Sequence, residues 1–174
     1  MTKLRLKTAG DVCSLLASGV VDSAEWRRII DEWKMRKRVD VEDMTLDDYS
    51  TLSGMSSDWQ LSTFVAEKLG VKLTTSTSAK DYISFLAGVT DGIKRIQDAF
   101  EKIPSPSLST EEQQAGFGKL AFGLFGVVDK LARRQGVRDE DIKSLPVSSI
   151  IGKLMIDGRT AICERRYNEI IRRR

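Results

Sequence analysis

Histidine is absent from this chain of 174 residues, which removes the commonest general base, proton shuttle and metal ligand of proteins. No serine or cysteine triad that depends on histidine can be built from these residues alone. The only cysteines, Cys13 and Cys163, are too few for a tetrahedral zinc site unless carboxylates complete it. Both lie within apolar helical patterns, so we expect reduced, buried thiols that act as small hydrophobic side chains.

Long apolar runs are also missing. No stretch reaches the roughly 18 apolar residues of a spanning helix, and the first residues lack the apolar core of a signal peptide. The longest apolar tract, residues 115–128, is short and contains Lys119. We therefore expect no membrane span, and a protein that is cytosolic or is assembled in the cytosol into a larger particle.

What is present is an ordinary globular composition, with 41% hydrophobic and 30% charged residues and a net charge of +3. The length suits one domain, or two small parts that share a core. The stiff segment 104–109, which holds two of the three prolines, divides the chain. We expect an N-terminal helical part at 1–103, a turn or linker at 104–109, and a C-terminal helical part at 110–174.

Apolar residues recur at helical spacing and strand patterns are almost absent, which predicts an all-α fold of about seven helices in a compact bundle. The longest expected helices cover residues 22–38, 58–69, 79–103, 110–135 and 147–174. In the last helix the expected apolar stripe includes Ile150, Leu154, Tyr167, Ile170 and Ile171. The N-terminal residues 3–7 alternate between leucine and basic side chains, which fits a short extended arm.

Capping residues and glycines near the expected helix ends support these boundaries. Asp11, Thr45 and Asp58 are expected N-caps, and Gly136 is an expected C-cap. Gly92 is a candidate for a bend or break inside the 79–103 helix. Carboxylates gather at expected helix starts, where the helix dipole alone explains them, so we assign no catalytic, metal or cofactor-binding residues.

A glycine- and phenylalanine-rich tract within the 110–135 helix is the first candidate for function. Its glycines would let a neighbouring backbone approach closely, either in the protein's own core or at a face for self-association or a partner helix. A helix lying on a membrane surface is a further interpretation. The candidate partner-binding residues here are Gly116, Phe117, Phe122 and Phe125.

A basic C-terminus is the second candidate. It contrasts with the stretch 39–58, which carries six acidic residues and no basic one. The arginines could form a solvated face, a nucleic-acid contact, or a charged surface that pairs with the acidic stretch of another copy. The candidate residues are Arg165, Arg166, Arg172, Arg173 and Arg174. Trp26, Trp33 and Trp59 are interpreted as core residues, with anchoring of a partner as the alternative.

Two stretches resemble small helical proteins of tailed bacteriophages, especially the tail assembly chaperones encoded near the tape-measure gene. The first is Met44-Thr45-Leu46-Asp47-Asp48-Tyr49, followed by the helix with Ala79-Lys80-Asp81-Tyr82. The second is Val127-Val128-Asp129-Lys130-Leu131, then Leu145-Pro146-Val147 and a last helix that ends near Glu164-Arg165-Arg166-Tyr167. The basic C-terminus departs from the acidic character expected of such chaperones.

The resemblance implies a non-enzymatic phage assembly or virion protein that acts through helical protein–protein interfaces. It would be tail-associated, chaperone-like, or part of a ring or connector. Its partners would be tail or capsid components, with homo-oligomers as an option, and it would act in the host cytoplasm during assembly or remain in the virion. The alternative is a small nucleic-acid-binding or regulatory protein that uses its arginine-rich ends.

Overall fold

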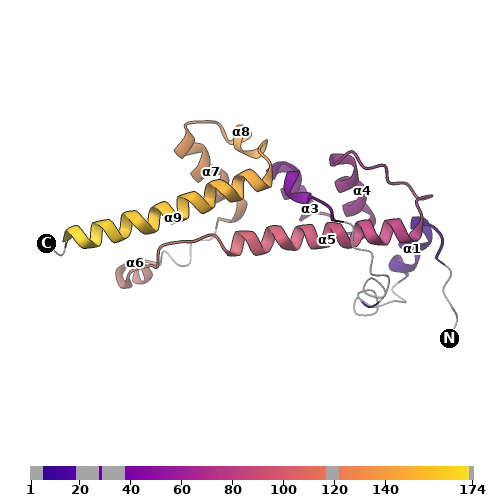
Figure 1. Ribbon diagram of the computed structural model, residues 1–174, viewed down its shortest axis with the longest axis horizontal. Helices are drawn as coiled ribbons and strands as arrows, with labels where there is room; N and C mark the ends of the chain where they lie inside the picture. The colour runs from indigo at the N-terminus through magenta and orange to yellow at the C-terminus, as the bar shows by residue number, and fades with distance from the viewer. Residues whose placement is uncertain (1–5, 19–27, 29–37, 117–121, 173–174) are drawn as a thin grey trace. The chain divides into compact units, whose positions relative to one another are not determined.

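The computed structural model describes residues 6–18, 28, 38–116 and 122–172, and in these ranges the expected all-α fold is confirmed (Figure 1). These residues form no strand, and their only β-type pairings are isolated bridges between Thr8 and Ser78 and between Thr45 and Pro146. The helices are α1 (Ala9–Ala17), the 3₁₀ turn η1 (Val41–Asp43), α3 (Leu46–Leu52), α4 (Asp58–Lys68), α5 (Ala79–Glu101), α6 (Thr110–Gln114), α7 (Gly123–Gln135), α8 (Asp139–Lys143) and α9 (Val147–Arg172).

The chain divides into two compact units, and each is described by itself below. The first unit comprises Met1–Met44 and Thr51–Arg95, and the second comprises Thr45–Ser50 and Ile96–Arg174. The proline-containing segment 104–109 belongs to the second unit. The expected helix at 22–38, with Trp26 and Trp33, and most of the expected N-terminal arm lie outside the described residues.

In the first unit, α1 packs on the start of α5 through a small apolar core. Ala9 and Val12 of α1 are buried with Ala79, Tyr82 and Ile83 of α5. The Tyr82 ring also lies 5.6 Å from the Trp59 ring, centroid to centroid, in a tilted arrangement. Trp59 is half-buried against this cluster, which agrees with its interpretation as a core residue.

In the first unit, polar residues just before α1 and α4 cap the N-termini of these helices. The Asp11 N–H donates to the Thr8 hydroxyl, and the Asp11 carboxylate accepts from the Thr8 N–H, so Thr8 rather than Asp11 is the N-cap of α1. Ser57 likewise caps α4 in place of the expected Asp58. In both cases the predicted cap is a carboxylate one to three residues inside the helix, where it also favours the positive end of the dipole.

The segment from Val39 to Met44, which contains the 3₁₀ turn η1, crosses α5 at a glycine. A Cβ atom on Gly92 would lie 2.6 Å from a Val41 methyl carbon and 3.1 Å from the Val39 carbonyl oxygen. Val39 and Val41 are both buried at this crossing. Gly92 therefore does not break α5, as its sequence position suggested it could, but allows a second segment to lie directly on the helix.

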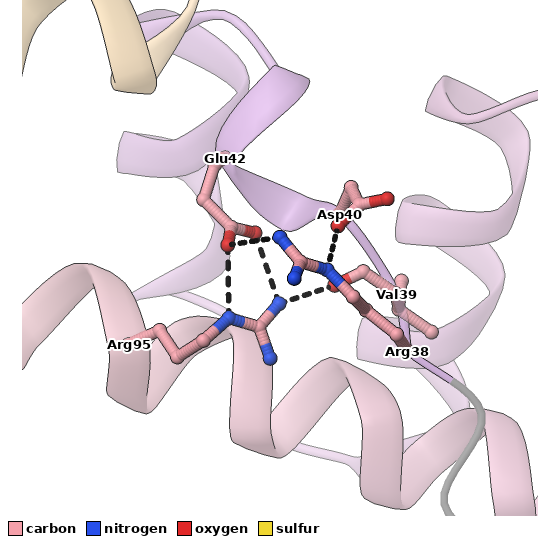
Figure 2. A network of polar contacts seen from close by, with 5 residues as sticks. All are labelled: Arg38, Val39, Asp40, Glu42 and Arg95. Carbon is pink, nitrogen blue, oxygen red and sulfur yellow. Dashed lines mark hydrogen bonds and ion pairs between the residues drawn. The ribbon is translucent and has the colours of Figure 1, made fainter.

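Arg95, one turn further along α5, clamps the same segment (Figure 2). Its Nε and one Nη donate to the two oxygens of Glu42 at 2.9 and 3.1 Å, and the same Nη donates to the Val39 carbonyl at 2.8 Å. Arg38 donates to Asp40 and lies 3.9 Å from Glu42. Burial opposes ionisation of Glu42, but hydrogen bonds and charge from Arg95 outweigh it, so the Glu42 pKa lies below its usual value.

The second unit contains a similar crossing at Gly158 of α9. A Cβ atom there would lie 1.9 Å from the Pro104 carbonyl oxygen, so the segment after α5 passes against bare helix backbone. Beside it, the carboxylate of the buried Asp157 forms an ion pair with Arg134 of α7, with 2.5 Å between a carboxylate oxygen and a guanidinium nitrogen. The core of this unit is formed by the buried residues Leu46, Ile96, Val128, Leu131, Ala132, Ile142, Val147, Ile150 and Leu154.

The start of α3 is tied to the loop before α9 within the second unit. The Leu46 N–H donates to the Leu145 carbonyl at 2.9 Å, and Thr45 pairs with Pro146. The Thr45 hydroxyl accepts from the Asp48 N–H, which confirms Thr45 as the cap of α3. Gly136 ends α7 in the left-handed conformation expected of a C-cap.

The single helix predicted over 110–135 is wrong, because two helices occupy its described residues. Helix α6 ends at Gln114 and α7 begins at Gly123. Gly116 has φ of +87° and Gly123 has φ of +53°, and both angles are incompatible with continuing a right-handed helix. Phe117 to Ala121 lie outside the described residues. The glycines here interrupt a helix rather than admit a neighbouring one.

The Glu42 clamp predicts a specific acid dependence of stability. Because the folded-state pKa of Glu42 is lowered, its contribution is complete above the usual value of 4.5 and is lost as the pH falls below it. Glu42→Gln is expected to unfold more easily than the wild type at neutral pH, and the difference should shrink in acid. Denaturant unfolding across the acid range measures this. Asp43→Asn, an exposed neighbour, is the control, and an equal effect there would contradict the clamp.

The Gly158 crossing predicts opposite effects of two glycine substitutions in α9. Gly158→Ala forces a methyl group onto Pro104, and such overpacking costs about 1–3 kcal/mol, against a gain of about 1 kcal/mol in helix propensity. Gly152→Ala meets no atom within 4 Å and should gain the propensity alone. Thermal unfolding should therefore show a lower Tm for the first variant and an equal or higher Tm for the second. A rise in both would refute the crossing.

Candidate interaction surface

Helix α9 has two apolar faces. The first carries the buried residues Val147, Ile150, Leu154 and Gly158, which pack within the second unit. At 3.6 residues per turn, Ile156, Cys163, Tyr167 and Ile170 form a second stripe about 175° around the axis from the first. We call these four residues the outer stripe. It runs about 21 Å along the helix.

The outer stripe is exposed along its whole length. The exposed fractions are 65% for Ile156, 64% for Tyr167 and 57% for Ile170, and Cys163 is also exposed. Ile171, at the edge of the stripe, is 51% exposed. Single exposed apolar residues are common, but a continuous line of them on one helix face marks an interaction site.

The second half of α9 has little support from its own unit. From residue 163 to 172 every side chain is exposed except Arg165, which is half-buried. A helical stretch of this length is marginal in water by itself. Its described contact is with α6, where Arg165 donates to Glu112 at 3.2 Å while also lying 3.5 Å from Glu169.

Glu112 links two elements at this point. Its carboxylate accepts from the Ser109 N–H at 2.7 Å in the capping box of α6 and also pairs with Arg165. The Ser109 N–H chiefly, and the charge of Arg165 in addition, hold the Glu112 pKa below its usual value. Arg165 is therefore occupied inside the unit, on the side of α9 away from the outer stripe.

Charged residues border the outer stripe asymmetrically. Arg159 and Arg166, seven residues apart, lie along one edge, and Glu164 lies along the other. All three are exposed, and within the described ranges none forms an ion pair in its own chain. The stripe therefore has one basic edge and one acidic position on its opposite edge.

The residues predicted to bind partners fall into two groups. Phe122 and Phe125 are 64% and 70% exposed at the start of α7, and Gly116 follows α6 in a left-handed turn. Arg165, Arg166 and Arg172 lie on α9, whereas Phe117, Arg173 and Arg174 lie outside the described residues. No hydrogen bond or ring contact within the described ranges joins the phenylalanines to the arginines.

The outer stripe was missed because the sequence prediction assigned its C-terminal residues to the core. Tyr167, Ile170 and Ile171 were expected to continue the buried stripe of Ile150 and Leu154, and they are exposed instead. The signal lies in the spacing. Ile156, Cys163 and Ile170 repeat every seven residues, out of phase with the buried face. Cys163 likewise is exposed rather than buried.

A cavity in the first unit is a concave alternative to this surface. Its volume is about 430 Å³, and its lining residues are Cys13, Leu16, Ala17, Ser56, Ser57, Asp58 and Trp59. Burial raises the pKa of the Cys13 thiol, which leaves it a poor nucleophile at neutral pH. Among the described residues no three potential metal ligands cluster, and no described helix is long and apolar enough to cross a bilayer.

The two thiols should differ in reactivity. Cys163 is exposed on α9, whereas Cys13 is half-buried and burial raises its pKa. In dilute protein, Ellman's reagent should modify Cys163 in a fast phase and Cys13 in a slower one. Cys163→Ser should remove only the fast phase and Cys13→Ser only the slow phase. A fast phase retained in Cys163→Ser would show that this part of α9 is covered.

No protein-family model, curated protein or solved structure matches this chain. What the protein does is therefore inferred from the surfaces of its own helices.

Proposed function

We propose that this chain is a non-enzymatic assembly or virion protein of a tailed bacteriophage, tail-associated, chaperone-like or part of a ring or connector. It acts by presenting helical faces to other proteins. The observation that carries the proposal is the outer stripe, an exposed apolar face on a helix whose opposite face is already packed. The protein works in the host cytoplasm during assembly, or stays in the particle it helps to build.

The energetics of the outer stripe favour a protein partner. Fully burying one large apolar side chain is worth about 1.5–3 kcal/mol, so covering Ile156, Tyr167 and Ile170 offers several kcal/mol before the costs of association. The helix is already formed, so little further ordering is needed when a partner binds. A partner would also stabilise the second half of α9, whose described polar contact with the rest of its unit is made by Arg165.

The residues that carry the phage resemblance support the proposal from a second direction. Thr45 and Leu46, from the first stretch, pair with Leu145 and Pro146, from the second stretch. Residues 45 and 46 of the first stretch and residues 145 and 146 of the second thus meet in the second unit, next to the start of α9. The lack of histidine in the sequence also favours a binding role over a catalytic one.

Nucleic-acid binding is the second candidate, and the exposed arginines of α9 favour it. Arg159, Arg166 and Arg172 are exposed, and their charges are available to phosphates. Glu164 and Glu169 interrupt this basic surface, and the net charge is only +3. Binding of labelled DNA or RNA that weakens steeply with added salt, and is lost when these arginines are replaced by glutamine, would favour this candidate over assembly.

The assembly role is tested by co-sedimentation. When the chain is expressed with the structural proteins encoded beside it, it should sediment with assembling tails or particles. Tyr167→Ser combined with Ile170→Ser should abolish that association while leaving Tm unchanged, because both side chains are exposed. Val71→Ser, an exposed apolar position in the first unit, is the control. Equal co-sedimentation of the stripe variant and the control would exclude the outer stripe as the assembly surface.

A further inference from the structure

The outer stripe has the residue pattern of a two-stranded coiled coil. Ile156, Cys163 and Ile170 repeat every seven residues, and Thr160 and Tyr167 follow four residues after the first two of them. The first set occupies the d positions of a heptad repeat, and the second set occupies the a positions. The pattern covers two heptads of a helix that is continuous from Val147 to Arg172.

The edges of the stripe fall at the positions that select coiled-coil partners. Arg159 and Arg166 occupy g positions, and Glu164 occupies an e position. In a parallel pair, a g residue of one helix faces the e residue five positions later on the other. Arg159 of one copy therefore meets Glu164 of the second copy, and twofold symmetry makes this contact twice.

We propose that a second copy of this chain covers the outer stripe, through parallel, in-register pairing of the two α9 helices around Ile156, Cys163 and Ile170, with Arg159–Glu164 ion pairs between the copies. The inference rests on the proposed function and specifies the first partner of the same surface.

The charges favour the parallel over the antiparallel arrangement. Antiparallel pairing places g against g and e against e, so that arginine edges face each other and the two Glu164 side chains lie on the same side. Like charges at these positions are destabilising. Parallel pairing places the basic edge of each helix against the acidic position of the other. Only that arrangement gives complementary charge on both sides of the stripe.

The rest of the second unit leaves room for this pairing. The buried face of α9 lies about 175° from the stripe, and α6 contacts α9 through Arg165 on that far side. Two heptads with threonine and cysteine among the central residues bury a modest apolar area. We therefore expect a dimer that forms and separates with concentration rather than a permanent one.

Cross-linking through Cys163 tests the register. In a parallel pair, equivalent d residues face each other across the axis, so the two Cys163 thiols are close. In the full-length Cys13→Ser variant, where Cys163 is the only thiol, mild oxidation with copper–phenanthroline should give a disulfide-linked dimer. The control carries both cysteines as serine with Asn168→Cys, an exposed site on another side of α9. Equal cross-linking at the two sites, or none at Cys163, would overturn the proposal.

Charge reversal tests the orientation. Sedimentation analysis over a range of concentrations should show weaker dimerisation for Arg159→Glu and for Glu164→Arg, with recovery in the double variant. In an antiparallel pair, Arg159→Glu would instead strengthen dimerisation by meeting an arginine edge. That result, or a chain that stays monomeric at every concentration while binding vesicles of anionic lipid, would overturn the proposal. Circular dichroism checks that each variant remains folded.

The two proposals fail separately. A monomeric chain that still co-sediments with particles through the outer stripe would refute the pairing of two copies and leave the assembly role standing. A parallel dimer that never joins tails or particles would do the reverse.

Discussion

Each unit of this protein depends on a short segment of chain that lies against a long helix at a glycine. In the first unit the segment around Val41 crosses α5 at Gly92, and in the second the segment at Pro104 crosses α9 at Gly158. A side chain at either position would occupy the space of the crossing backbone or its side chains. In the first unit Arg95 holds the crossing segment through Glu42. In the second unit Asp157, the residue before Gly158, forms an ion pair with Arg134 of α7.

The crossing at Gly158 also determines what α9 can offer to other molecules. The inner face of the first half of the helix is buried at this crossing, where Leu154 and the ion-paired Asp157 also lie. The helix then continues well past this packing, with Arg165 as its main tether. A helix extended beyond its own core, with apolar residues on its outer face, is suited to contact between protein chains. The proposal that the protein acts by binding other proteins rests on this arrangement.

Local features were predictable from the sequence, and contacts distant in the chain were not. The all-α fold, the Thr45 cap and the Gly136 C-cap follow from periodicity and from residues adjacent to each helix end. Gly92 was recognised as unusual, but its role is to leave space for Val41, which lies about fifty residues earlier in the chain. No sequence pattern around Val41 predicts this contact. The glycines near Phe122 were interpreted as helical because apolar spacing continues through them. Gly116 and Gly123 instead have positive φ angles, and α6 and α7 are separate right-handed helices. Arg165, Arg166 and Arg172 lie on the C-terminal helix that the sequence predicted, whereas the outer stripe was merged with the core because both faces are apolar.

The separation of α9 into a packed half and an outer half has a consequence for how such a protein evolves. Residues around Gly158 are constrained from several sides, so nearly any change there lowers folding stability. Residues such as Tyr167 and Ile170 touch little of their own chain, and natural selection is free to alter them without cost to the core. A lineage of such proteins would diversify its binding specificity at the end of one helix while the scaffold beneath it stayed the same.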